Sequence, residues 1–154
     1  MAAAALDRAL ALNPNAAHAW IARGFIHALR NQPEAAIEAC ERARRLSPFD
    51  PHSYRYAGLI AFVHLAARRF EQAIEWADRA LHGQQRFVSA LRVKVVALAH
   101  LGHLDAARAE LNRMLAIDPK LTIAGYREYA HFFVAPELLE LFVTGLRLSG
   151  LPEG

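Results

Sequence analysis

Cysteine and β-branched residues are both scarce in this chain, and each scarcity excludes a class of structure. Cys40 is the only cysteine among 154 residues, so neither an internal disulfide nor a thiolate zinc site can form. Val, Ile and Thr number 7, 7 and 2, whereas Ala and Leu number 32 and 21. This bias favours helix over sheet. We therefore predict an all-α protein in which Cys40 is a small buried residue.

Long hydrophobic runs are also missing. The longest stretch without a charged residue, 9–22, contains Pro14 and two asparagines and is shorter than the ~20 apolar residues that span a bilayer. The N-terminus has no basic region, and Asp7 and Arg8 interrupt its apolar residues, unlike a secretory signal. The sequence predicts a cytoplasmic protein without a membrane partner.

Lysine occurs only twice, and the 18 basic residues exceed the 15 acidic ones by a formal charge of +3. The arginines alternate with acids from Arg8 to Arg147, so they form no continuous stripe that could follow phosphates. We predict no nucleic-acid partner. The preference for Arg over Lys, together with the abundance of Ala, is typical of GC-rich bacterial coding sequences.

Motifs for catalysis and metal binding are absent from the sequence. There is no glycine-rich phosphate loop, no Gly-x-Ser-x-Gly and no His-Glu-x-x-His. His100 and His103 have the spacing of a metal-binding pair, but no third ligand lies near them in the sequence. We predict no catalytic residue, no cofactor and no metal site.

Internal repetition is the main signal. Residues 17–50 and 88–121 superpose as 34-residue units with Ala at unit position 20 and Pro at position 32. The first unit also has Trp, Gly and Ala at positions 4, 8 and 27. Its five pattern residues are Trp20, Gly24, Ala36, Ala43 and Pro48.

These residues and spacings resemble the tetratricopeptide repeat (TPR) family. The resemblance implies a right-handed α-solenoid of antiparallel helix pairs, closed by a C-terminal capping helix. Small residues allow the paired helices to approach closely. We therefore expect nine residues at helix contacts to be largely buried: Trp20, Gly24, Ala36, Ala43, Gly58, Ala73, Ala80, Ala107 and Leu111.

One domain over 1–154 is predicted, divided into a half repeat, three repeats and a degenerate capping helix pair. In the second repeat Tyr54 and Gly58 fit the pattern, but Ala73 and Ala80 arrive three residues late, which predicts a first helix about one turn longer. The initial half repeat lacks its first helix, as expected of a piece of a longer protein. The units are 1–16, 17–50, 51–87, 88–121 and 122–154.

In TPR solenoids the first helices line a concave, partner-binding surface. Here that surface is predicted to be apolar with a basic row, because Arg55 and Arg92 share position 5 of successive units. A protein or peptide with apolar anchors and acidic residues would be complementary. Ile21 and Phe25 replace the Lys and Asn of TPR clamps for C-terminal carboxylates. The predicted site residues are His18, Ile21, Phe25, His52, Arg55, Leu59, Phe62, Ser89, Arg92, Val96 and His100.

The C-terminal segment carries a second resemblance. Phe132, Pro136-Glu137, Gly145-Leu146-Arg147 and Gly150-Leu151-Pro152-Glu153 are similar to the ends of TPR regions attached to proteobacterial class III adenylate/guanylate cyclases. This implies a regulatory, non-catalytic scaffold module, with any cyclase activity in a domain absent from this chain.

Three alternatives to partner binding remain open. The chain could be a homo-oligomerisation module, associating through Leu6 and Leu10 of a partly covered first helix. It could be a structural spacer with an empty groove, or a regulator that responds to a small molecule in that groove.

Overall fold

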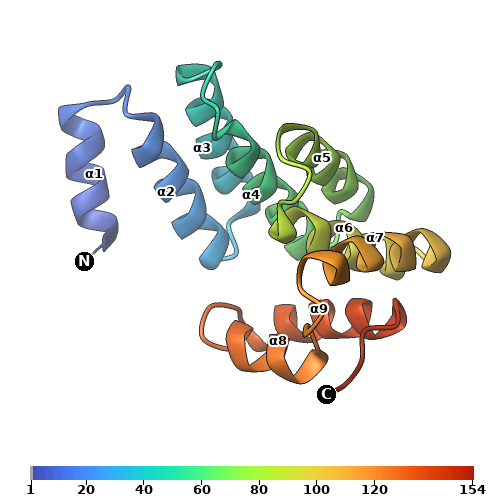
Figure 1. The fold of residues 1–154 in the computed structure, drawn as a ribbon. Coiled ribbons are helices and arrows are strands. Elements are labelled where there is room, and N and C mark those ends of the chain that lie inside the picture. The colour runs from blue at the N-terminus through green and yellow to red at the C-terminus, as the bar shows by residue number, and fades with distance from the viewer. Residues whose placement is uncertain (1) are drawn as a thin grey trace.

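The structure, a computed structural model, describes residues 2–154, and within this range it contains helices and no strand. Figure 1 shows the helices stacked as antiparallel neighbours in chain order, with the last two in a layer beneath the others. The predicted all-α solenoid is therefore confirmed. Its helices are α1 (Ala2–Leu12), α2 (Ala17–Leu29), α3 (Pro33–Leu46), α4 (Ser53–Ala66), α5 (Phe70–Gly83), α6 (Val88–His100), α7 (Leu104–Ile117), α8 (Ile123–Ala130) and α9 (Pro136–Leu148).

The same tight turn joins the helices of the three central pairs. Asn31, Arg68 and Gly102 each have positive φ, between 55° and 83°. In each turn the residue after the positive-φ residue donates its backbone N–H to the carbonyl five residues earlier. The hydrogen bond from Arg69 N–H to the His64 carbonyl oxygen, for example, is 2.8 Å long. This left-handed closure satisfies carbonyls at the helix end. The recurring turn fixes the antiparallel arrangement within each pair.

The predicted lengthening of α4 by one turn is wrong. The helix has 14 residues, against 13 in both α2 and α6. Most of the three-residue delay of Ala73 and Ala80 arises in the connection 47–52 between α3 and α4. This connection is longer than the connection 84–87 between α5 and α6. The repeat boundaries themselves stay a prediction.

Hydrogen bonds order this longer connection. Asp50 accepts from the Tyr56 hydroxyl at 2.5 Å and from the His52 backbone N–H at 2.8 Å. These bonds hold the pKa of Asp50 below its usual value, the Tyr56 bond contributing most. Burial, followed by the bond to Asp50, raises the pKa of Tyr56 to about 12. The connection is thus tied to the first turn of α4.

Small residues set the distances between helices, as predicted. A Cβ on Gly24 would lie 2.7 Å from Cys40 Sγ and 3.2 Å from the Ala36 carbonyl oxygen, so only glycine fits where α2 meets α3. Cys40 is buried, and burial raises its pKa to about 12. Eight of the nine residues expected at helix contacts are buried: Gly24, Ala36, Ala43, Gly58, Ala73, Ala80, Ala107 and Leu111.

Trp20, the ninth, is only half-buried. Its ring has the guanidinium groups of Arg23 and Arg42 at 5.6 and 4.6 Å from the ring centroid, and its indole N–H donates to the Pro14 carbonyl at 2.8 Å. Trp20 therefore stabilises the outer surface of the first repeat through cation–π contacts instead of filling the core.

The first helix packs on the second. Leu10 is buried and Leu6 half-buried, while Asp7 and Arg23 form an ion pair at 3.4 Å. Leu10 is thus already used within the chain. The structure therefore corrects the expectation that Leu10 is available to a symmetric homodimer, whereas self-association through Leu6 stays a prediction.

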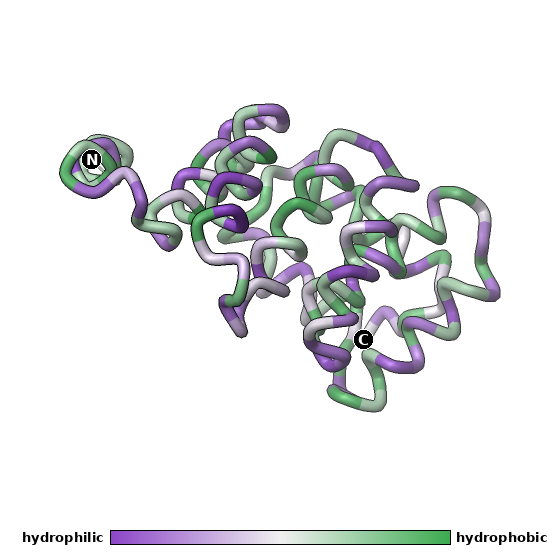
Figure 2. Tube along the Cα trace, turned by 90° about the horizontal axis from the view of Figure 1, so that it is seen from above, coloured by the Kyte–Doolittle hydropathy of each residue, from purple (hydrophilic) through white to green (hydrophobic). Residues whose placement is uncertain are grey.

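The C-terminal pair folds back instead of extending the row. α9 packs on α6, and it contributes Phe142, Val143 and Leu146 to the core shared with the central repeats. Figure 2, seen from above, shows hydrophobic and hydrophilic segments alternating along the helices, as expected when each helix buries one face. The capping pair therefore covers the face of α6 that was predicted to bind a partner.

Candidate functional site

The third-repeat part of the predicted concave surface is occupied by the chain itself. Val96 is fully buried, with Gly145 of α9 packed against it. His100 stacks on Phe70 with ring centroids 5.2 Å apart, and its Nε2 lies 2.8 Å from the Leu141 carbonyl oxygen. Both residues were expected to contact a partner. The structure corrects this expectation, since α9 buries Val96 and holds the half-buried His100 through the Leu141 carbonyl.

Arg92 is partly covered, although we expected it to be accessible. It is half-buried, and its guanidinium lies 5.0 Å from the centroid of the Tyr126 ring in α8. Burial raises the pKa of Tyr126 to about 12, so this phenol stays neutral beside the cation. The buried Nε of Arg92 has no hydrogen-bond partner within residues 2–154, which leaves an unused donor.

Six of the predicted residues do come together. They line an open, largely apolar hollow of about 440 Å³ formed by α2, α4 and the start of α6. His18 and His52 are exposed and lie outside it. The six are Ile21, Phe25, Arg55, Leu59, Phe62 and Ser89.

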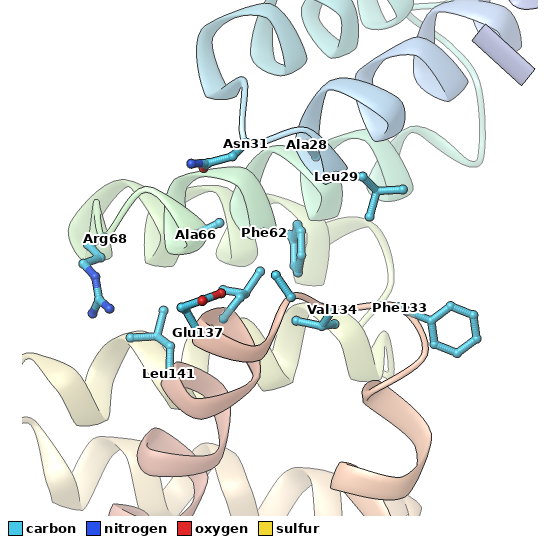
Figure 3. A pocket seen from close by; sticks show the side chains of 12 residues that line it. Ala28, Leu29, Asn31, Phe62, Ala66, Arg68, Phe133, Val134, Glu137 and Leu141 are labelled. Carbon is cyan, nitrogen blue, oxygen red and sulfur yellow. The ribbon is translucent and has the colours of Figure 1, made fainter.

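A second wall, made of residues outside the predicted set, faces this hollow. Tyr129, Phe133 and Val134 from α8 and the turn after it line a cavity of about 270 Å³ together with Phe25 and Phe62. A third cavity, of about 430 Å³, separates Leu29 and Phe62 from α9 (Figure 3). In Figure 3 these two side chains lie above Val134 and Leu141.

The three cavities adjoin one another around Phe62, which lines all of them. We call this space the cleft; one wall is Phe25, Leu29 and Phe62, and the other is Tyr129, Phe133 and Leu138. Phe25, Leu29, Tyr129 and Phe133 are 48%, 55%, 62% and 58% exposed. Large apolar side chains exposed around one concavity mark an interaction surface.

The missed wall had a sequence signal. Residues 129–134 read Tyr-Ala-His-Phe-Phe-Val, a dense aromatic cluster that the turn between α8 and α9 leaves in solvent. Aromatic residues are enriched at protein interfaces. Their position opposite α2, however, depends on how the last helix pair folds back.

Cations surround the cleft. Arg55 is exposed, and its Nε makes only a long hydrogen bond, 3.4 Å, to the Tyr54 hydroxyl. Arg55, Arg68 and Arg92 form no ion pair with a carboxylate in the part of the chain from 2 to 154. Half of the ion pairs in that range link neighbouring helices or turns. Glu137 is the acid that lines the cleft. An apolar cleft bordered by free guanidinium groups suits a carboxylate-bearing apolar ligand.

The described residues contain neither a metal-binding cluster nor a membrane-spanning helix. No group of three or more His, Cys, Asp or Glu side chains is placed to hold a metal ion within residues 2–154. Among the helices in the same range, none combines the length and apolarity needed to cross a membrane.

Solved structures share this fold. The type IV pilus biogenesis factor PilW has a TM-score of 0.72 at 17% identity, covering 92% of this chain and 66% of that one. MamA scores 0.67 at 17% identity, covering 94% and 82%. YrrB, described as a TPR protein with an unusual peptide-binding site, scores 0.61 at 20% identity, covering 93% and 74%. Identities this low show the fold alone.

Sequence comparison identifies the family. The Homo sapiens protein FK506-binding protein-like is 34% identical over 104 residues, which are 64% of this chain and 30% of that protein; the chain thus spans less than a third of this relative. The tetratricopeptide repeat profile matches residues 2–51 and 59–121, which include α1 and most of the three central helix pairs. With the profile matching well over half of its length, the chain belongs to the tetratricopeptide repeat family.

Proposed function

We propose that this TPR module is a non-catalytic scaffold that binds a segment of another protein in the cleft between α2–α4 and the α8–α9 turn. The observation that carries the proposal is the set of exposed apolar side chains on both walls, with Phe25 and Phe133 on opposite sides. Exposing these residues to water is unfavourable, and a bound apolar segment would cover them.

Charge defines the partner more closely. Arg55 stands free at one border of the cleft, and Arg92 also lines the cleft without a carboxylate partner among residues 2–154. A carboxylate on the partner would gain charge-assisted hydrogen bonds from either guanidinium. The partner is therefore a protein or peptide with apolar anchors and acidic residues.

The context of the module is a second part of the proposal. The similarity of residues 132–153 to TPR regions attached to class III cyclases supports a regulatory role within a larger bacterial signalling protein in the cytoplasm. Reading the coding sequence upstream of residue 1 tests it: an adjoining cyclase domain would support this context, and an unrelated domain would contradict it.

The binding role is tested by selecting peptides from a displayed library against the whole chain and measuring their Kd by fluorescence polarisation. Phe25→Glu and Phe133→Glu change the two walls, and Phe49→Glu is the matched control because Phe49 is 95% exposed outside the cleft. We expect both cleft variants to weaken binding by more than about tenfold, roughly the value of burying one aromatic side chain. Equal affinities for all three variants, with unchanged circular dichroism, would contradict the proposal.

A further inference from the structure

The hollow between α2 and α4, which is the apolar part of the cleft, is unsuited to an extended peptide. Such a peptide exposes backbone N–H and C=O groups on both sides, and each one that is buried without a partner is unfavourable. The hollow between α2 and α4 offers only Arg55 and Ser89 as polar side chains among nine lining residues. Amide side chains that could hold a backbone are missing there, since Ile21 and Phe25 occupy the facing positions of α2.

A helix has no such difficulty, because its backbone hydrogen bonds are made internally. Only its side chains need to match the walls, and one apolar stripe at i, i+3, i+4 and i+7 would do so. An apolar cleft therefore selects for helix over extended chain.

The molecule already shows a helix bound to the adjoining part of this surface. Phe142 of α9 stacks on Phe62 with ring centroids 6.0 Å apart and lies 5.9 Å from the Tyr126 ring. One turn earlier, Leu138 projects into the cleft beside Phe62 and Leu29. The cleft thus adjoins an interface in which an amphipathic helix packs on α6 and reaches Phe62 of α4.

We propose that the occupant of the cleft is an amphipathic helix of another protein, with apolar residues in one stripe and a carboxylate at the stripe's edge that faces Arg55. This rests on the proposed function and specifies the partner's conformation. Arg55 belongs to α4 and borders the apolar hollow, so a Glu or Asp one turn away from an apolar anchor would reach it. Neutral or basic helices lack this contact.

Two displayed libraries of 18-residue peptides test the proposal against the full chain. One has a helical alanine-rich frame with a randomised apolar stripe and randomised edge positions. The other contains Gly and Pro at intervals that prevent helix formation. We expect cleft-dependent binders, defined by loss of binding to the Phe25→Glu variant, from the helical library alone.

A proline scan of the best binder provides the second readout. Proline in the middle of the peptide should weaken binding about 100-fold, because it breaks the helix. Proline at the first helical position is the matched control and should be tolerated. Arg55→Glu should weaken binding about tenfold for an acidic binder, whereas Arg45→Glu, an exposed site on α3 outside the cleft, should not.

The outcomes separate this proposal from the preceding one. Cleft-dependent binders from the extended library, or equal tolerance of proline at both positions, would overturn the helical partner while leaving the cleft as a binding site. Failure to obtain any cleft-dependent binder from either library would overturn both.

Discussion

Gly145 of α9 lies directly against the backbone of Val96 in α6: a Cβ on Gly145 would stand 2.9 Å from the Val96 Cα. The absence of a side chain lets the two helices approach to backbone contact. This approach places α9 across the face of α6 and brings the turn before it opposite α2. The second wall of the cleft therefore depends on one glycine.

Gly145→Ala should destabilise the protein. The new methyl group collides with backbone, which cannot move aside as a flexible side chain could, so we expect a loss of about 1–3 kcal/mol in the free energy of unfolding. Urea denaturation measures it. The neighbouring, exposed Thr144 is the control, and Thr144→Ala should change stability by less than ~0.5 kcal/mol. Equal stability of the two variants would refute the close contact.

Gly24→Leu should destabilise the first repeat. Even a Cβ at this position would overlap Cys40 Sγ at 2.7 Å, and overpacking of this kind costs roughly 1–3 kcal/mol. Ala22→Leu, two residues away on the exposed side of α2, should leave thermal unfolding nearly unchanged. If both variants melted at the temperature of the original protein, the packing of α2 on α3 would be misassigned.

Lys94→Ala should also lower stability. The ammonium group of Lys94 lies 2.8 Å from both Asp78 in α5 and Glu110 in α7, and its side chain is mostly covered. Burial opposes its charge, but the two carboxylate hydrogen bonds raise its pKa above the usual value. Removing it leaves Asp78 without its ionic partner and the mostly covered Glu110 with Arg113 alone, at a cost of about 1–3 kcal/mol. Lys120→Ala, at an exposed lysine, should have no measurable effect in the same denaturation assay.

His64 should make stability depend on pH. Burial, together with the nearby Arg69 cation, lowers its pKa, although Glu34 and Glu75 act in the opposite direction. The unfolded chain then takes up a proton near pH 6.5 more readily than the folded chain, so the free energy of unfolding falls as the pH drops below that value.

Replacing His64 should therefore flatten this dependence. His64→Leu is expected to lose less stability than the original protein between pH 7.5 and 5.5. Substitution of His82, which is exposed on α5, should preserve the original slope. Parallel slopes for the His64→Leu variant and the original protein would show that His64 does not titrate differently on folding.

Much of the fold could be predicted because it is encoded locally. Ala36, Ala73 and Ala107 mark the second helix of each central pair, and all three are buried. The error in α4 arose because an uncharged run such as 56–67 fits either a longer helix or a shifted one. Tyr54 and Gly58 matched the repeat pattern by residue type, yet the turn at Arg68 lies 37 positions after Asn31 and 34 before Gly102. The extra residues therefore lie before that turn, and most of them are in the connection 47–52.

Of the candidate site, only the wall formed by α2 and α4 could be predicted from the sequence. Phe25, Leu59 and Phe62 follow from their positions in first helices, which repeat periodicity locates. The contacts of α9 with Val96 and His100 join residues 49 and 41 positions apart in the sequence. No local periodicity specifies such a contact, and Gly145 alone would not have indicated which helix it meets.

The most direct test of the central claim, that a partner binds between α2–α4 and the α8–α9 turn, is an NMR titration of the isotopically labelled chain with a selected helical peptide. We predict that the largest amide shifts at saturation fall on α2, α4 and α8, at and beside Phe25, Phe62 and Tyr129. Residues of α3, α5 and α7 that lie on the opposite side of each helix pair should change little. Shifts concentrated on those second helices, with the two walls of the cleft unperturbed, would contradict the account.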